Sequence, residues 1–598
     1  MNQIKELQLK TGGQWLVEPV TNKKILCRES FSEEYKDIEK LITNFAKDKI
    51  FPNVYKIDKF DELLSKSLLQ EMGELGLIGV DTPEEYGGSG LDKITACIIA
   101  EGVQRGGSAS FGCTFGVQTA IGSLGIVFFG TSKQKKKYLP GLMKGEKIAA
   151  YALTEPGSGS GSDALSAKTS AVLSNDKKHY ILNGEKQFIS NGGWADIFTI
   201  LVQVDGNKFS GFIIEKGTEG FTIGSEEKKM GVKGSSTTSL KFTNAKVPVE
   251  NLLYKVGKGA SIAFGALNIG RYKLAAASLG GSKIALELTI DYALERRQFG
   301  QPIAKFNSIE GKIADLAVRI YSADAMLYRT VGLIQEAIDE LDKSSSEYYI
   351  QMVKTMERFS IESSMAKVYG SETSDEVVDS CLQIFGGYGF IEEYPMAMAY
   401  RDDRINRIWE GTNEINRSII TGYMMKKVLM EEISLREYLR DIDDFLKNEL
   451  DKDSNDIFKT EKYALEAAKK TASMIFNEAL CEFGQDLKHE QQLSETLANI
   501  FTNIYVSESV IYRTQYSKSD TKALKQSNTI AKIYVAESLL EIKSMIPKCT
   551  NHIFKELIPE NVDTIICQLE KKITLKTNTI SMKSKLAEFM FTQKQYPF

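Results

Sequence analysis

The spacing of the apolar residues changes along the chain, and this change limits the fold more than any other feature. In "FSEEYKDIEKLITNFAKDKI", Ile38, Leu41 and Phe45 follow one another at intervals of three and four, which predicts an amphipathic helix. Around residue 180 the pattern changes to that of strands: "IFTILVQV" and "FSGFIIEK" read as buried strands, and Asn183-Gly184 between two short strand-like runs predicts a two-residue hairpin turn. Helical spacing then returns. The predicted fold class is therefore mainly α with a central β domain.

These changes predict four domains. The expected boundaries are 30–150 for an N-terminal helical domain, 151–255 for the β domain, 256–428 for a helical bundle and 429–598 for a further helical region.

Composition excludes several classes of protein. The 598 residues carry 75 basic and 79 acidic side chains, a balance that argues against general electrostatic binding of nucleic acid. No uninterrupted apolar run approaches the 18 or so residues that cross a bilayer. The three histidines are far apart and the seven cysteines form no CxxC pair, so we expect no metal site and no Ser-His-Asp triad. The N-terminus lacks a signal sequence, and a reducing, cytoplasmic location is expected.

Two segments of the predicted β domain are candidates for ligand binding. "YALTEPGSGSGSD" from Tyr151 to Asp163 alternates glycine with hydroxyl residues, so its backbone N–H groups could approach an anion, although it is neither a Walker loop nor the start of a βαβ unit. In "EKQFISNGG", Phe188 and Ser190 are two apart and should share one face of a strand. An aromatic face beside a hydroxyl suits a planar heterocycle; an ordinary sheet aromatic is the alternative.

Two further motifs lie in the helical bundle. "ERRQFGQPI" and "QIFGGYGF" combine cations with glycines, which suits either close approach to a ligand or simple helix ends. In "RIWEGTNEINR", Glu410 follows an apolar pair and precedes a Gly-Thr turn. A carboxylate beside Trp409 would have a raised pKa and could act as a general base, whereas a solvated acid at a helix N-terminus is the alternative.

A weak internal repeat appears at an offset of 184 residues. At this offset "IADLAVRIYSADAMLYRT" from Ile313 lies over "LANIFTNIYVSESVIYRT" from Leu497. Further on, "AKVYGSE" from Ala366 resembles "AKIYVAE" from Ala531, although the intervening length differs. Either the last region is a degenerate copy of the helical bundle, or two amphipathic helices are similar by chance.

Taken together and in this order, the motifs resemble those of the acyl-CoA dehydrogenase family, over residues 30 to 428. The C-terminal extension resembles that of the very-long-chain branch, which bacterial enzymes of similar length also carry. The resemblance implies an N-terminal helical domain, a β-barrel domain, a four-helix bundle and, here, an extra non-catalytic helical domain, with FAD as cofactor.

The resemblance also assigns roles to residues. Glu410 corresponds to the base that removes the α-proton of an acyl thioester while the β-hydrogen leaves as hydride to flavin N5, and its backbone N–H would hold the thioester carbonyl. The implied cofactor-binding residues are Tyr151, Leu153, Thr154, Ser162, Phe188, Ser190, Arg296, Gln298, Phe299, Gln383, Gly386, Gly387, Thr412 and Glu414. The implied substrate-binding residues are Ser162, Gly122, Asn268, Gly270, Arg271 and Gly411. Arg296, Gln298, Phe299, Gln383, Gly386 and Gly387 correspond to residues that reach the FAD of a neighbouring subunit.

The chain departs from the family pattern in two places. The Gly/Ser loop is two residues longer than usual, so Ser162 is aligned from its Ser-Asp end, and Phe188 replaces the usual Trp. Gly270 excludes the alternative base that some members carry before the arginine. Gly122 replaces the glutamate that closes the acyl tunnel of medium-chain members, which implies a deeper tunnel and a preference for long chains.

The resemblance implies an enzyme of fatty acid β-oxidation that converts long-chain acyl-CoA to trans-2-enoyl-CoA and passes electrons to electron-transfer flavoprotein. An acyl-CoA oxidase using O₂ and a non-catalytic flavin-binding scaffold are the alternatives. Because the extra domain of extended members covers the face used for tetramer formation, we expect a homodimer. The Lys-rich C-terminus favours a solvated helical tail, with weak association to an anionic membrane surface as the alternative.

Overall fold

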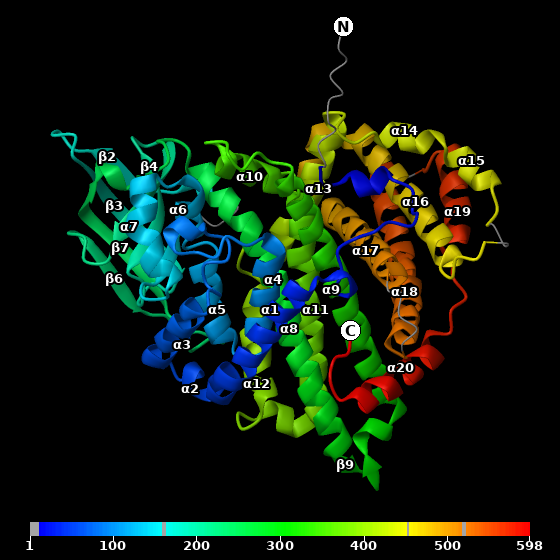
Figure 1. The fold of residues 1–598 in the computed structure, drawn as a ribbon. Helices are drawn as coiled ribbons and strands as arrows, with labels where there is room; N and C mark the ends of the chain where they lie inside the picture. The colour runs from blue at the N-terminus through cyan, green and yellow to red at the C-terminus, as the bar shows by residue number, and fades with distance from the viewer. Residues whose placement is uncertain (1–10, 158–162, 451–453, 517–521, 556) are drawn as a thin grey trace.

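The computed structural model describes residues 11–157, 163–450, 454–516, 522–555 and 557–598. A β domain lies at one side of the molecule, long helices fill the centre, and a further helical layer lies at the other side (Figure 1). Seven helices precede the β domain in this part of the chain: α1 (Glu33–Phe45), α2 (Val54–Asp58), α3 (Glu62–Glu74), α4 (Lys93–Gln104), α5 (Ala109–Thr119), α6 (Leu124–Phe129) and α7 (Ser132–Met143).

The β domain is one twisted sheet. Its strands are β1 (Ala149–Ala152), β2 (Ser170–Leu173), β3 (His179–Ser190), β4 (Ile197–Val204), β5 (Lys208–Glu215), β6 (Phe221–Glu226), β7 (Thr237–Pro248) and β8 (Leu252–Leu253). They are ordered β6-β7-β3-β2-β4-β5-β8, with β1 parallel to β4. Strand β4 is buried along its whole length, as its unbroken apolar run predicts.

The predicted hairpin turn at Asn183-Gly184 is wrong, because β3 runs straight through it. The pairing with β7 instead shifts register between Leu182 and Gly184, where φ of Gly184 is 138° and a Cβ would lie 2.7 Å from Cα of Thr169. The Asn183 amide oxygen accepts a hydrogen bond from the Asn244 N–H at 2.8 Å across this bulge. A bulge and a close approach of backbone therefore account for the Asn-Gly pair.

The central helices and the outer layer follow the sheet in sequence. The central set is α8 (Gly259–Glu295), α9 (Asn307–Asp339), α10 (Tyr348–Glu357), α11 (Ser360–Phe385), α12 (Pro395–Asp403) and α13 (Asn413–Leu429), with a small β9 (Arg297–Gln298) and β10 (Gln301–Pro302) arm after α8. The outer set is α14 (Leu435–Arg440), α15 (Ile442–Lys447), α16 (Lys459–Phe483), α17 (Gln491–Tyr516), α18 (Lys522–Phe554), α19 (Glu560–Ile573) and α20 (Thr579–Gln593).

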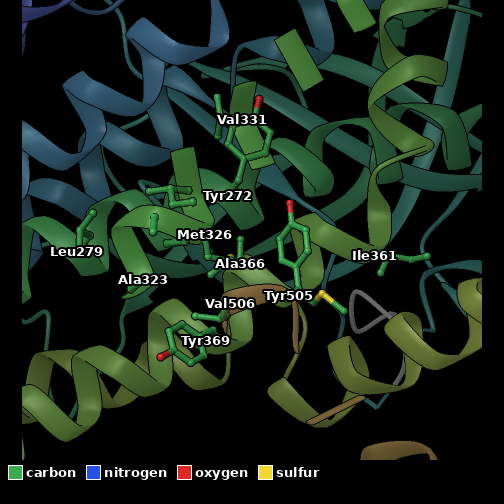
Figure 2. Packing of buried hydrophobic residues seen from close by; sticks show 14 of the residues in the cluster. Tyr272, Leu279, Ala323, Met326, Val331, Ile361, Ala366, Tyr369, Tyr505 and Val506 are labelled. Carbon is green, nitrogen blue, oxygen red and sulfur yellow. The ribbon is translucent and has the colours of Figure 1, made fainter. Parts of the chain in front are cut away.

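Two hydrophobic cores hold these layers together. One joins α1, α3, α4 and α5 to the sheet, and the other joins α8, α9 and α11 to the outer helices. Figure 2 shows the second core, where Tyr272 of α8, Met326 of α9 and Ala366 of α11 meet Tyr505 and Val506 of α17. The outer helices therefore share a continuous interior with the central ones.

Helices α9 and α17 contact each other through residues that the 184-residue offset relates. The Tyr321 hydroxyl lies 3.0 Å from Oγ1 of Thr514, and the Tyr505 hydroxyl lies 3.2 Å from Oγ1 of Thr330. Likewise Arg513 pairs with Asp324 at 3.0 Å, and Arg329 pairs with Glu508 at 2.9 Å. Each contact therefore occurs twice with the partners exchanged, as beside an approximate two-fold axis, which favours a true repeat over chance similarity.

The N-terminal segment and the C-terminal helix are both docked. Trp15 and Leu16 are buried, and the Trp15 ring lies 5.1 Å from that of Tyr505. Helix α20 packs on α9 and α18 with Leu586 and Met590 buried. The prediction of a solvated tail is therefore wrong for α20; contact with a membrane surface remains a prediction.

One stretch of the described chain, Ala109–Phe129, is long and apolar enough to span a membrane by length and composition alone, although the sequence analysis expects none. Its mean hydropathy is 1.5, but 83% of its 18-residue window is buried inside the fold. It comprises α5, α6 and the turn between them, which pack in the protein core.

Candidate active site

A large cavity lies between the sheet and the central helices. Its volume is about 1140 Å³, and residues of α5, β3, α8, α12 and the start of α13 line it. Nine of the predicted site residues gather there: Tyr151, Leu153, Thr154, Phe188, Ser190, Gly270, Glu410, Gly411 and Thr412. Residues more than 250 positions apart in sequence thus face one space.

The sheet wall of the cavity is fixed by contacts from β3. The Lys186 ammonium donates to the Leu153 carbonyl at 3.0 Å, and the Gln187 N–H donates to the Thr154 carbonyl at 2.9 Å. A second register shift between Lys186 and Ile189 places Phe188 at φ +58°, with 58% of its surface exposed. Regular alternation is therefore broken here: Phe188, Ile189 and Ser190 all line the cavity, so the shared position of Phe188 and Ser190 does not follow from their two-residue spacing.

The opposite wall is the turn that carries Glu410. Both Glu410 and Gly411 have positive φ values, +58° and +80°, which is unusual for a glutamate. The Asn416 side-chain amide donates to the Gly411 carbonyl at 2.8 Å and to the Thr412 carbonyl at 3.0 Å. The Thr412 hydroxyl accepts from the Ile415 N–H and so caps α13.

The Glu410 carboxylate has an unusual electrostatic environment. Its Oε2 is buried and makes no hydrogen bond to any described residue. Burial raises the pKa of Glu410 to about 7, while the nearby charges of Arg271 and Lys367 oppose that rise. The prediction of a desolvated, raised-pKa carboxylate is therefore confirmed, and the alternative of a solvated acid is wrong.

Gly270 has no side chain, and the Glu410 carboxylate occupies the space that a side chain would fill. A Cβ at position 270 would lie 2.6 Å from Oε2 and 2.8 Å from Cδ of Glu410. The helix backbone of α8 thus approaches the carboxyl group directly, and any side chain here would displace it.

Tyr151 and Arg271 complete the surroundings of the carboxylate. Burial, and secondarily the Glu410 charge, raise the pKa of Tyr151 well above its usual value, and its buried hydroxyl has no partner within the described ranges. Arg271 donates to the Asn268 side-chain oxygen at 2.9 Å, and burial lowers the pKa of its guanidinium. The Tyr151 hydroxyl and Oε2 of Glu410 therefore belong to residues that line the cavity and have no hydrogen-bond partner among the described residues, as in a ligand site.

Three expected substrate residues lie outside the cavity lining. Asn268 and Arg271 are buried behind it. Gly122 faces the other way: a Cβ there would lie 2.8 Å from Cβ of Ala149 and from the Val117 carbonyl. The argument that Gly122 deepens the tunnel therefore fails, because this position faces packed backbone. Ser162 lies outside the described residues.

A separate group of predicted residues lies at a second site. Arg296, Gln298, Gly386 and Gly387 line a cavity of about 450 Å³ that shares no lining residue with the first. Gln383 and Glu414 are exposed, and Phe299 is 93% exposed on the arm after α8. The structure therefore places none of Arg296, Gln298, Phe299, Gln383, Gly386 and Gly387 in the lining of the Glu410 cavity within one chain, whereas Glu414 follows Glu410 by four residues.

Two residues that hold the Glu410 turn, Lys367 and Asn416, are not among those predicted from the sequence. Asn416 follows the turn by four residues within "EGTNEIN", where an amide could have suggested a bond back to the turn. Lys367 comes from α11, more than 40 residues earlier, and its only signal is a lone cation in the apolar run "SMAKVYG".

Comparison with known proteins identifies the family. Models described as the N-terminal, middle and C-terminal domains of acyl-CoA dehydrogenase match residues 32–146, 150–245 and 257–425, and another described as an acyl-CoA dehydrogenase C-terminal domain matches 467–553. A probable acyl-CoA dehydrogenase of Bacillus subtilis is 43% identical over 99% of both chains. The human mitochondrial very long-chain specific acyl-CoA dehydrogenase is 39% identical over 60% of this chain and 53% of its own.

A solved structure agrees with these matches. The crystal structure of an acyl-CoA dehydrogenase complexed with FAD from Bacillus anthracis superimposes with a TM-score of 0.94 at 40% identity, covering 98% of this chain and 100% of that one. The chain therefore belongs to the acyl-CoA dehydrogenase family and is an oxidoreductase that binds FAD. The match over its full length, including the outer helices, relates it to the long bacterial members.

Proposed function

We propose that the protein oxidises long-chain fatty acyl-CoA to trans-2-enoyl-CoA, with Glu410 as the base that removes the α-proton. The observation that carries this proposal is the buried, unpartnered Oε2 of Glu410 at the cavity between sheet and bundle. A carboxylate whose pKa is about 7 is half ionised near neutral pH. Its proton affinity therefore suits a general base that works at that pH.

The residues around the cavity fit FAD. Phe188 offers an exposed aromatic face, and Ser190, Thr154 and Thr412 offer hydroxyls to a planar, polar-edged ring system. When bound, FAD supplies the two-electron acceptor for the hydride that leaves the β-carbon as Glu410 takes the α-proton. We expect the backbone N–H of Glu410 to donate to the thioester carbonyl and so stabilise the charge that develops there.

The preference for long chains rests on two observations. The cavity is large and mainly apolar, with Val103, Leu274 and Leu288 among its lining residues. The matched relatives include a very-long-chain enzyme. Each buried CH₂ contributes roughly 0.8 kcal/mol, so a long apolar channel favours long chains.

The physiological setting is also proposed. We expect electron-transfer flavoprotein as acceptor, a cytoplasmic location and a homodimer. Support for the dimer comes from Phe299 and Phe390, which are 93% and 82% exposed beside the second cavity, where a second copy could cover them.

The test is anaerobic titration of the purified holoenzyme with saturated acyl-CoAs of increasing length. Loss of the yellow flavin absorbance, strongest with long chains, is the expected result. Failure of every acyl-CoA to bleach the flavin would contradict the proposal, and rapid peroxide formation under air would favour an oxidase.

A further inference from the structure

Lysine 367 lies fully buried in the middle of α11 and binds the turn that carries Glu410. Its relative exposure is 0%, and its ammonium donates to the Gly411 carbonyl at 2.8 Å and to the Asn413 side-chain oxygen at 2.7 Å. It does not line the cavity. Burying an ammonium is costly, so a lysine at this position needs an explanation beyond packing.

The turn needs an external support. A glutamate with positive φ stores backbone strain that persists only where the surroundings hold the conformation, whereas Gly411 adopts its positive φ without strain. The Gly411 carbonyl accepts from both Asn416 and Lys367. Asn416 belongs to the helix that follows the turn, so it moves with the turn, whereas Lys367 ties the turn to a different helix.

We propose that Lys367 is the positioning residue of the base: it fixes the Glu410-Gly411 turn against α11, keeps the carboxylate aimed into the cavity, and supplies a nearby positive charge that favours its ionised form. This inference rests on the proposed role of Glu410. The charged and titratable groups facing Glu410 are Arg271 from α8, Lys367 from α11 and Tyr151 from β1.

Electrostatics supports this assignment. Burial lowers the pKa of Lys367 to about 7, while the charges of Glu410, Glu372 and Glu414 oppose that fall and Arg271 adds to it. Removing the lysine deprives the Glu410 carboxylate of a neighbouring cation, so the pKa of Glu410 should rise. The pH at which flavin reduction reaches half its plateau should therefore rise too.

The internal repeat offers a comparison. Lys532 of the outer layer takes the place of Lys367 in the "AKIYVAE" copy, but no Glu-Gly-Thr turn occurs in that part of the sequence. The lysine is fully buried only in the copy that carries the turn, since Lys532 is half-buried.

The experiment compares Lys367→Met and Lys367→Gln with a control, Lys469→Met. Lys469 is also 0% exposed and mid-helix, but it binds the Glu18 carbonyl and Glu508, far from the turn. Each holoenzyme is assayed for anaerobic flavin bleaching by the acyl-CoA that reduces the wild type fastest, across pH 5.5–9 (roughly two units about the Glu410 pKa). Thermal unfolding and FAD content are measured alongside.

For Lys367→Met we expect the plateau rate of flavin bleaching to be at least about tenfold lower than in the wild type. We expect the pH at which this rate reaches half its plateau, the pH midpoint, to rise by about one unit. Lys367→Gln, whose amide can still donate to the Gly411 carbonyl, should recover much of the plateau but keep the raised midpoint. Lys469→Met should lower thermal stability and leave both kinetic readouts unchanged. A crystal structure of Lys367→Met should show Glu410 out of its positive-φ conformation.

The proposal is overturned if Lys367→Met keeps the wild-type plateau and midpoint, or if Lys469→Met shifts them equally. If Lys367→Met does not retain FAD, the proposal is overturned when Lys367→Gln has the same pH midpoint of flavin bleaching as the wild type. Failure of the wild type to bleach at all would instead refute the proposed function, so the two failures are distinguishable.

Discussion

At the scale of single residues, the proposed chemistry depends on one carboxylate, Glu410, whose Oε2 is buried. Oε2 of Glu410 has no hydrogen-bond partner among the described residues, and the Glu410 backbone has a positive φ. Gly270 of α8 lies directly against its carboxyl group. Strain and an unsatisfied polar atom at the same residue are characteristic of a functional position rather than a structural one.

Replacing Glu410 by Gln should remove the base and keep the shape. We expect retained FAD and normal thermal unfolding, with anaerobic flavin bleaching slowed by about 10² to 10⁴, the usual contribution of a general base. Stopped-flow absorbance measures the rate. Bleaching at the wild-type rate would show that another group takes the proton.

Gly270→Ala should displace the carboxylate without unfolding α8. The new Cβ would come 2.6 Å from Oε2, the flexible end of a side chain, so the carboxyl group must move. A misplacement of this size costs about 10²-fold in rate. Gly422→Ala in α13, where a Cβ meets open space, is the matched control and should keep full activity. Equal rates in both variants would contradict the steric argument.

At the scale of elements, local sequence predicted the long segments well and the irregular ones poorly. The helical spacing of residues 32–51 and the apolar run of β4 gave the correct element type because burial on one face or on both sides leaves a clear pattern. Asn183-Gly184 predicted a hairpin turn where the structure has a β-bulge. Both features need the same residue types, and only the pairing with the partner strand distinguishes them.

The residues of the candidate active site also divide into those that local motifs predict and those that depend on distant segments. Glu410, Phe188 and the Gly/Ser loop stand out as local motifs, so a sequence suffices to nominate them. Lys367 and the closely packed Gly122 could not be judged from local sequence, because Lys367 contacts Asn413 of α13 and Gly122 contacts Ala149 of β1, segments that only the fold brings near.

The N-terminal segment should depend on one buried acid of α11. Oε1 of Glu362 accepts from the Gly13 N–H at 2.6 Å and from the Trp15 indole at 3.1 Å. Glu362→Ala leaves both donors unpaired, which should lower the free energy of unfolding by about 2–4 kcal/mol and raise hydrogen exchange at residues 13–20. Glu33→Ala, at an exposed helix start, is the control. Unchanged exchange would mean that packing of Trp15 alone holds the segment.

At the scale of the whole molecule, the outer helices pack on the central bundle in the manner of a second subunit. The reciprocal contacts between α9 and α17 resemble those that a two-fold interface makes between identical subunits. The face of the bundle that they cover is thus closed to another copy.

We therefore expect light scattering to give twice the chain mass and not four times. The exposed arm with Phe299 remains open to a second copy, whereas the α9 face does not. A tetramer at working concentrations would contradict this, and a monomer would refute the dimer proposed from the arm.

The α9–α17 contact has one more consequence. An association between separate molecules weakens on dilution, but two surfaces joined within one polypeptide meet at a fixed effective concentration set by the connecting segments. The two ion pairs between these helices therefore persist at any protein concentration: Arg513 with Asp324, and Arg329 with Glu508. Dilution would separate two copies joined at the arm, as proposed, but it cannot separate this contact within one chain.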